Sequence, residues 1–387
     1  LDDAEIVLSR TDSILVDISA SFVELRDLVV EAGRTHLLRV NGNNNLISGV
    51  TLRNGGARGA SISGTDSGLR DCIVHGTATG AVTLSGGDRP SLAPGASFID
   101  NCDLHHFGRT EWTYRPGVSL SGVGHAVTNN RMHHAPHSAV LYGGNNHLIA
   151  RNEIFEVCEY SSDAGAIYAG RDWGARGNVV EHNFIHHLRT KLQGWGVHGI
   201  YLDDCLSGIT VRGNVLYDIE NNGLVHGGGR DNLFVNNIMA NCGTAISADA
   251  RGFEWRPDAG PNNTPGDSWN LLEKLENVNY RQEPWLSTWP ACAAIPDDWE
   301  AIIAPEATWL YPEGCVFARN LGWANGNWMA GDLAYDHYAS IADNLDDADP
   351  LFVDEANLDL SLLPDSPAFT IPGWEDIPFD QIGIVIP

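Results

Sequence analysis

The feature that most constrains the fold is an internal repeat. An asparagine followed by alternating apolar residues recurs at Asn101, Asn130, Asn152, Asn183, Asn214 and Asn237, in steps of 29, 22, 31, 31 and 23 residues. A second strand-like unit lies between successive copies, as in GAIYAGRD (165–172) and HGIYLDD (198–204). Two or three short strands per step, separated by Gly and Asn turns, predict an all-β chain in which each step is one coil of a parallel β-helix.

Stacking of the coils follows from burial. One coil cannot bury its inner face alone, so inward residues such as Ile167, Ile200 and Ile246 are expected to form ladders through the stack. The recurring Asn is expected at a turn, where its amide bonds to the next coil. A β-propeller needs about 40–50 residues per blade, which the shorter steps cannot supply. A right-handed helix is expected from the general preference of parallel β connections.

The repeat also divides the chain into segments. Coils are predicted over 1–252, and the final coils and a C-terminal tail over 313–387. The segment 253–312 breaks the pattern, is rich in Trp and Pro, and has helix-like stretches at 268–278 and 297–303. This loop and helix insertion is either a cap with its own aromatic core or a wall over a groove. Cys292 and Cys315 flank its end and could pair, whereas the other cysteines are expected to be buried in the coils.

Charge limits the partners. The formal net charge is -27, from 23 basic and 50 acidic residues. Nucleic-acid binding needs the opposite sign, and an anionic membrane surface would repel the chain. No apolar run approaches the ~20 residues of a membrane span. The acidic, lysine-poor composition suggests a secreted or periplasmic protein, and the start at Leu1 suggests that N-terminal sequence is missing.

Polar residues follow one type of strand in four consecutive coils. They are Arg171 and Asp172, Asp203 and Asp204, Arg230 and Asp231, and Asp249 and Arg251. Coils lie ~4.8 Å apart. Stacked strand ends would therefore hold carboxylates about 5 or 10 Å apart, close to the two separations of glycoside hydrolysis. Such closeness drives pKa values apart, which suits an acid and a base. The alternative is that these residues only cap strands or form ion pairs.

Other residues of these coils suggest a sugar site. Asp163 opens the strand of Tyr168, and aromatic residues that can stack on sugars lie nearby. Asp203 or Asp204 is predicted as nucleophile or base, with Asp172 or Asp163 as acid. The candidate substrate-binding residues are Tyr168, Arg171, Trp173, Trp195, His198, Tyr201, His226, Arg230, Asp249 and Arg251.

Histidine pairs at 105–106, 133–134 and 186–187 recur with the repeat. They could ligate a metal, but repeated histidines on a solenoid are more typical of stacking and turn positions. No metal site and no cofactor is predicted, except that a lyase could hold Ca²⁺ between aspartates.

Several segments resemble a known group of proteins. APHSAVLYGGNNHLIARNEIFEVC (135–158), SSDAGAIYAGRDW (161–173), GIYLDDCLSG (199–208) and GGGRDNLFVNNIMANC (227–242) resemble right-handed parallel β-helix proteins of the pectin-lyase-like superfamily. The likeness is greatest to the glycoside hydrolase family 141 type, which includes an α-L-fucosidase and a xylanase. The resemblance implies a carbohydrate-active enzyme with acidic catalytic residues. The scaffold also carries lyases and epimerases, so the activity stays open.

Three functions are therefore considered. A glycoside hydrolase acting on a polysaccharide or oligosaccharide accounts for the carboxylates and the aromatic residues. A polysaccharide lyase would need a base and a cation that neutralises a uronate carboxylate, for which Lys191, Arg171 or Arg230 would serve. A non-catalytic carbohydrate-binding β-helix explains the coils but not the clustered Asp and Arg residues.

Overall fold

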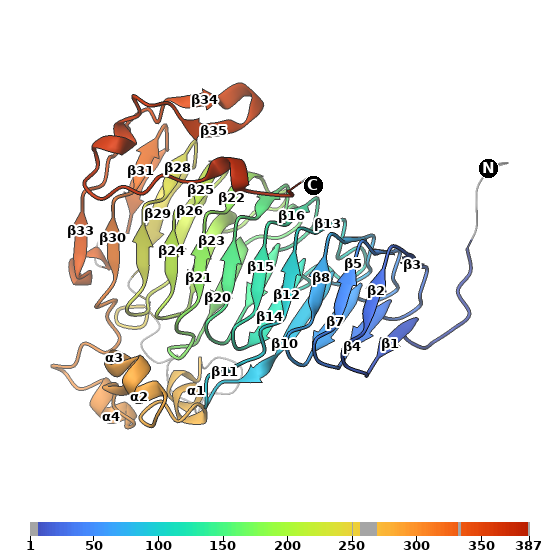
Figure 1. The fold of residues 1–387 in the computed structure, drawn as a ribbon. Coiled ribbons are helices and arrows are strands. Elements are labelled where there is room, and N and C mark those ends of the chain that lie inside the picture. Colours follow the sequence, from blue (N-terminus) through green and yellow to red (C-terminus); the bar gives the residue numbers. More distant parts are fainter. Residues whose placement is uncertain (1–6, 250, 256–268, 332–333, 386–387) are drawn as a thin grey trace.

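The chain is a stack of β-coils that carries a helical insertion on one side and a β-hairpin on the other (Figure 1). The computed structural model describes residues 7–249, 251–255, 269–331 and 334–385. Each coil contributes one strand to each of three parallel sheets, here called A, B and C. We name the corners between the sheets by the order in which the chain passes them: A-to-B, B-to-C and C-to-A.

Sheet A has 12 strands and holds the longest strands of the molecule. Its path is β1 (Val16–Ile18), β4 (Leu38–Val40), β7 (Ala60–Ser63), β10 (Val82–Asp88), β14 (Val118–Gly122), β17 (Val140–Tyr142), β20 (Ala164–Gly170), β23 (Val197–Asp203), β26 (Asn222–His226), β29 (Thr244–Ala248) and β32 (Asn327–Ala330), with β11 (Ala93–Pro94) antiparallel to β10.

Sheets B and C are built from shorter strands. Sheet B runs through β2 (Glu24–Arg26), β5 (Leu46–Ser48), β8 (Gly68–Arg70), β12 (Phe98–Asp100), β15 (Ala126–Thr128), β18 (Leu148–Ala150), β21 (Val179–Glu181), β24 (Thr210–Arg212), β27 (Leu233–Val235), β30 (Val316–Ala318) and β33 (Ser340–Ala342). Sheet C runs through β3 (Val29–Glu31), β6 (Thr51–Arg53), β9 (Ile73–His75), β13 (Asp103–His105), β16 (Arg131–His133), β19 (Glu153–Phe155), β22 (Phe184–Leu188), β25 (Val215–Ile219), β28 (Ile238–Ala240) and β31 (Leu321–Trp323).

The interior is a continuous apolar column, as the alternating pattern predicts. Ile167 pairs in register with Ile200, and Leu224 of the next coil pairs with Ile246. All four side chains are buried in one core cluster. Because successive residues of a strand face opposite sides, Tyr168 and Tyr201 point outward from sheet A.

A ladder of buried asparagines runs along the B-to-C corner. The Oδ1 atom of Asn183 accepts from the backbone N–H and from Nδ2 of Asn152, and the same pattern links Asn130, Asn214, Asn237, Asn320 and Asn344. The predicted bonding from coil to coil is confirmed for Asn130, Asn152, Asn183, Asn214 and Asn237, whereas Asn101 lies at a turn but outside the ladder. Cys102 takes the ladder position, and Asn101 is a positive-φ turn residue that bonds Asp71 and Val385.

The paired histidines form outward stacks on sheet C. The His105 ring stacks on His133 at 5.0 Å, and His186 stacks on Phe155 at 5.0 Å. In the described residues, no group of three or more His, Cys, Asp or Glu side chains is arranged to hold a metal ion. The stacking interpretation fits the observed ring geometry.

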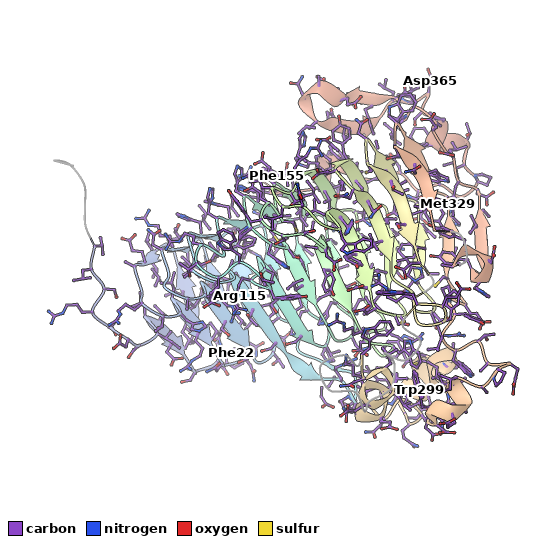
Figure 2. All side chains as sticks on the ribbon, turned by 180° about the vertical axis from the view of Figure 1, so that it is seen from behind. Phe22, Arg115, Phe155, Trp299, Met329 and Asp365 are labelled. Carbon is purple, nitrogen blue, oxygen red and sulfur yellow. The ribbon has the colours of Figure 1, made fainter. Side chains whose placement is uncertain are left out.

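The insertion leaves the coils after β29 and returns at β30. Its described part contains α1 (Leu271–Asn277), α2 (Trp285–Thr288), α3 (Pro290–Ala293) and α4 (Trp299–Ile302). These helices pack an aromatic core of their own, and Figure 2 shows Trp299 at this edge of the molecule. Part of the predicted insertion, 256–268, lies outside the described residues. Both Cys292 and Cys315 are buried free thiols, so the pairing considered above is wrong: Cys292 packs in the aromatic core of the insertion, and Cys315 contacts the Gly229 carbonyl.

The C-terminal segment forms a hairpin and then returns along the coils. The hairpin pairs β34 (Phe352–Asp354) with β35 (Asp359–Leu362). The chain that follows lies along the B-to-C corner, where Gly383 N–H donates to the Arg151 carbonyl at 2.8 Å (Figure 1). No helix in the described part of the chain is long and apolar enough to cross a membrane.

Candidate active site

Two adjacent aspartates form the centre of a charged cluster on the outer face of sheet A. β23 ends at Asp203, and Asp204 begins the A-to-B corner. The Nη1 atom of Arg251 contacts both carboxylates, and it lies 3.0 Å from Asp204 Oδ1. Arg171 Nε donates to the other oxygen of Asp204 at 2.5 Å, and Arg251 also pairs with Asp249 at 2.8 Å. Five charged groups from three coils thus meet at one corner.

Asp203 has the most unusual electrostatic environment of the cluster. Its side chain is 9% exposed, and Tyr168 donates a hydrogen bond to it at 2.7 Å. Burial raises the pKa of Asp203, and the charge of Asp204 raises it further, whereas Arg251 and hydrogen bonds from Tyr168 and Tyr201 oppose the rise. The net direction is upward, which favours a carboxyl group that holds its proton.

Asp163 lies across Tyr201 from Asp203. It is exposed at the start of β20, with positive φ, and accepts a hydrogen bond from the Tyr201 hydroxyl at 3.3 Å. The same Tyr201 side chain also lowers the pKa of Asp203, so both carboxyl groups interact with one tyrosine. The structure therefore brings together one exposed and one buried carboxyl group across an aromatic hydroxyl.

Glycines allow the charged groups to approach. Gly170 is the register partner of Asp203, and a Cβ there would lie 3.0 Å from the Asp203 carbonyl oxygen. A Cβ on Gly227 would lie 3.0 Å from the Arg251 guanidinium and 3.2 Å from Asp203 Oδ1. The position therefore has no room for a larger side chain without moving Arg251.

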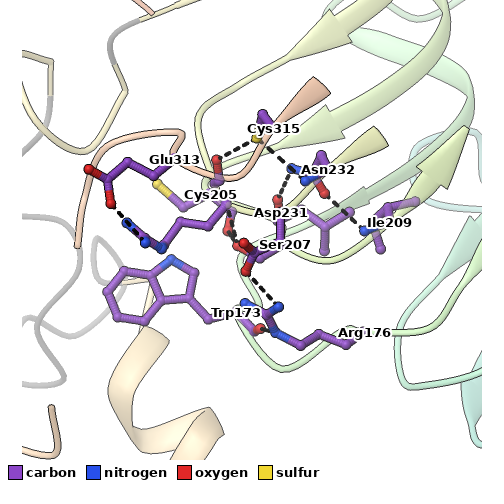
Figure 3. Close-up of polar contacts among 12 residues, drawn as sticks. Trp173, Arg176, Cys205, Ser207, Ile209, Asp231, Asn232, Glu313 and Cys315 are labelled. Atoms are coloured by element: carbon purple, nitrogen blue, oxygen red, sulfur yellow. Dashed lines mark hydrogen bonds and ion pairs between the residues drawn. The ribbon is translucent and has the colours of Figure 1, made fainter. Parts of the chain in front are cut away.

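Two predicted members of the cluster bond elsewhere. Asp172 is buried beside the insertion and pairs with Arg89 at 2.9 Å, while its other oxygen accepts from Gly174 N–H. Arg230 donates to the Thr308 carbonyl and to Glu313 at 3.0 Å, so it fastens the end of the insertion. Glu313 is labelled in Figure 3, which shows polar contacts in this region. The sequence pattern predicts that polar residues at the ends of neighbouring strands stack on one another. Asp203 is instead in register with Gly170, so Asp172 lies two residues beyond the position that would stack on Asp203.

Of the aromatic and histidine residues predicted for the site, some lie beside the carboxylates and others lie elsewhere. Trp173 is buried and stacks on Trp299 of the insertion, whereas Trp195 is 82% exposed beyond the other end of β23. His226 is fully buried and bonds Tyr338 and Asn232, so it belongs to the interior. His198 packs edge to face against Tyr201 at 5.2 Å, and burial lowers its pKa to about 4. Tyr168, Tyr201 and His198 therefore stay with the carboxylates.

The structure adds a lysine that the sequence did not indicate. Lys274 of α1 donates to the carbonyl oxygens of Arg171, at 2.5 Å, and of Trp269, at 2.9 Å. Burial lowers its pKa, and the charge of Asp172 opposes this. By contrast, Lys191 lies at the C-to-A corner with Glu159 and Tyr160. Only the folded insertion brings Lys274 to the cluster, so no spacing in the sequence could have signalled it.

Comparisons with known proteins agree with the architecture. A family model described as "Right handed beta helix region" matches residues 69–239. No curated protein matches the chain. Together with the three parallel sheets, the model match shows a right-handed parallel β-helix.

Solved structures similar to this chain include hydrolases and lyases. One is a glycoside hydrolase at 18% identity and a TM-score of 0.40, covering 52% of this chain and 38% of that one. Another is a PL6 alginate lyase in complex with a trisaccharide, at 13% identity and a TM-score of 0.45, covering 96% and 89%. A third is a PL6 family polysaccharide lyase from Pseudopedobacter saltans, at 12% identity and a TM-score of 0.46, covering 96% and 95%. These activities are those of the similar proteins.

Proposed function

We propose that the chain is a glycoside hydrolase whose reaction takes place on the outer face of sheet A. The observation that carries the proposal is the raised pKa of Asp203 beside a second, exposed carboxylate at Asp163. Glycosidic hydrolysis needs one protonated and one ionised carboxyl group in one site. The resemblance to the glycoside hydrolase family 141 type supports this choice, and a fucosylated or xylan-like polymer is the substrate that it suggests.

The different burial of the two carboxyl groups suggests a different catalytic role for each. Burial and the neighbouring Asp204 raise the pKa of Asp203, so of the two carboxyl groups it is the one that would protonate the leaving glycosidic oxygen. Asp163 is exposed on the other side of Tyr201. It would be either the nucleophile that attacks the sugar or the base that activates a water molecule. These roles reverse the sequence expectation, in which Asp203 was the base.

Basic residues position the pair. Arg251 holds Asp203 and Asp204 together, and Arg171 fixes the remaining oxygen of Asp204. Arg171 is half exposed, so one side of its guanidinium remains open to a sugar hydroxyl. Asp172 takes no direct part because Arg89 and the Gly174 amide occupy its oxygens.

A polysaccharide lyase is the second candidate, and Lys274 is the observation that favours it. A buried lysine with a lowered pKa is a better base than a free one. Arg171 would neutralise the uronate carboxylate while Lys274 takes the C5 proton. The proposed base is therefore Lys274 and not Lys191, which lies elsewhere. Against this candidate, the surrounding carboxylates repel an anionic substrate.

The two functions leave different products. The purified protein is incubated with xylan, fucoidan, pectin and alginate, and both reducing ends and ultraviolet absorbance are recorded. New reducing ends without absorbance, abolished by Asp203→Asn, are expected for the hydrolase. Absorbance from unsaturated uronates, abolished by Lys274→Gln, would replace the hydrolase with the lyase. If no polymer yields either signal, the enzyme proposal fails in favour of a binding β-helix.

A further inference from the structure

A separate aromatic pocket lies at the C-to-A corner, at the opposite end of the sheet A strands from Asp203. It has a volume of about 300 Å³ and is lined by Phe107, Trp112 and Tyr160, with His106, His134 and Glu159 among its polar residues. This volume falls at the lower end of the range for small-molecule sites. Neither Trp112 nor Tyr160 is used by the proposed reaction.

The two exposed rings of the pocket are held in place. Trp112 and Tyr160 are 47% and 38% exposed, and their ring centroids lie 5.0 Å apart. The Lys191 ammonium lies 4.4 Å from the Tyr160 centroid and 3.2 Å from Glu159. Exposed aromatic rings whose orientation is fixed before binding lose little entropy when a ligand stacks on them.

The rim of the pocket carries polar side chains whose negative charge is largely balanced by basic residues. The carboxylate of Glu159 is offset by Lys191. Arg109 also lines the pocket, and its side chain is exposed. Apolar ring faces beside hydrogen-bond donors match the alternating C–H and O–H groups of a pyranose ring, whereas an apolar peptide would leave the donors unpaired.

The pocket lies close to Asp163, the exposed carboxylate of the proposed active site. Tyr160 and Asp163 belong to the same turn, three residues apart, so their Cα atoms are separated by at most about 10 Å. The following loop of the pocket carries Tyr114 and Arg115, and the latter is marked in Figure 2. Tyr114 is near enough to Tyr168 to influence its pKa. A polysaccharide that passes Asp163 would therefore reach the pocket.

We infer that this pocket is a carbohydrate subsite that binds a sugar unit of the polymer against Trp112 and Tyr160. The inference rests on the proposed function, because the ligand is a distant part of the proposed substrate. It names a binding site beyond the charged cluster and predicts that longer oligosaccharides bind more tightly than short ones.

Affinity electrophoresis tests the subsite apart from catalysis. Wild-type protein, Trp112→Ala/Tyr160→Ala and the control Phe22→Ala are run through gels containing xylan, fucoidan, pectin or alginate. Phe22 is 81% exposed on a distant coil, so the control removes an equally accessible ring. The double variant should lose about tenfold in apparent affinity for the polymer that retards the wild type, while the control is unchanged. Trp112→Phe should retain most of the retardation.

Two results would overturn the subsite. One is equal retardation of the wild type and the double variant, with both folded by circular dichroism. The other is that none of the four polymers retards the wild type. Asp203→Asn in the same gels separates the two proposals: retardation of this variant without any product in the assays above would leave the subsite standing while the hydrolase fails.

Discussion

Removal of one rung of the asparagine ladder should destabilise the whole stack. In Asn183→Ala the side chain that disappears accepts two hydrogen bonds from Asn152, at 3.0 and 2.9 Å, and donates to Ile149 and Asn214, both at 2.9 Å. Asn152 Nδ2 keeps its bond to the Val127 carbonyl, and Asn214 Oδ1 keeps its bond from the backbone N–H at 183. The Asn152 backbone N–H loses its acceptor.

The expected loss follows from those bonds. One buried N–H without a partner, three further lost bonds and a small cavity together reduce the free energy of unfolding by about 2–4 kcal/mol. Urea denaturation followed by far-ultraviolet circular dichroism measures the change. Asn327→Ala is the matched control: this side chain is exposed on β32, so its loss should stay within about 0.5 kcal/mol. An Asn183→Ala midpoint equal to that of the control would refute the role of the ladder.

Three further predictions concern the site and the insertion. Asp203→Asn should lower kcat by about 10²–10⁴-fold in the polysaccharide assay, whereas Asp17→Asn, which breaks an exposed ion pair with Arg39 on the first coil, should stay near wild type. Wild-type activity should fall as pH rises through the raised pKa of Asp203, and equal losses in both variants would contradict the assignment. Burial lowers the pKa of His147 to about 3, so its uncharged form is favoured in the fold, whereas the unfolded chain protonates near pH 6.5. Stability should therefore fall from pH 6.5 toward 4, by about 3 kcal/mol at pH 4.5 for this residue. His147→Gln should flatten the dependence of thermal midpoint on pH, and an unchanged slope would argue against it. Arg89→Ala removes the ion pair with Asp172 and should expose 269–312 to limited proteolysis before the coils; cleavage as slow as in wild type would show that the pair does not hold the insertion.

The coils could be predicted because each obeys the same local rule. The alternating pattern places Ile200 inside the coil and Tyr201 outside it, and their partners in the next coil, Leu224 and Val225, follow the same pattern. Errors arose where turn length varies by one residue. The repeat was counted from Asn101, but the residue that occupies the ladder position in that coil is Cys102, whose N–H donates to Asn130. The predicted alignment of that coil was therefore off by one residue. Sequence alone does not distinguish a positive-φ turn asparagine from a buried one beside it.

The candidate site was predicted in part for the same reason. Asp203, Tyr201 and Tyr168 lie on regular strands, so their shared outer face follows from periodicity. Arg230 and Asp172 lie beyond the strand ends, where the insertion competes for their bonds. The position of the insertion depends on packing among aromatic residues that have no repeat, so its contacts could not be read from spacing.

The insertion is connected to the proposed reacting groups through hydrogen bonds and ion pairs, so it does more than cover one side of the site. Lys274 of the insertion holds the Arg171 carbonyl, and the Arg171 side chain holds Asp204. Arg251, which contacts both Asp203 and Asp204, stands where the chain leaves β29 for the insertion. Asp204 raises the pKa of Asp203 and Arg251 lowers it, so this pKa depends on how these two groups are held. A displaced insertion would therefore alter the acid itself, even if every coil of the β-helix stayed in place.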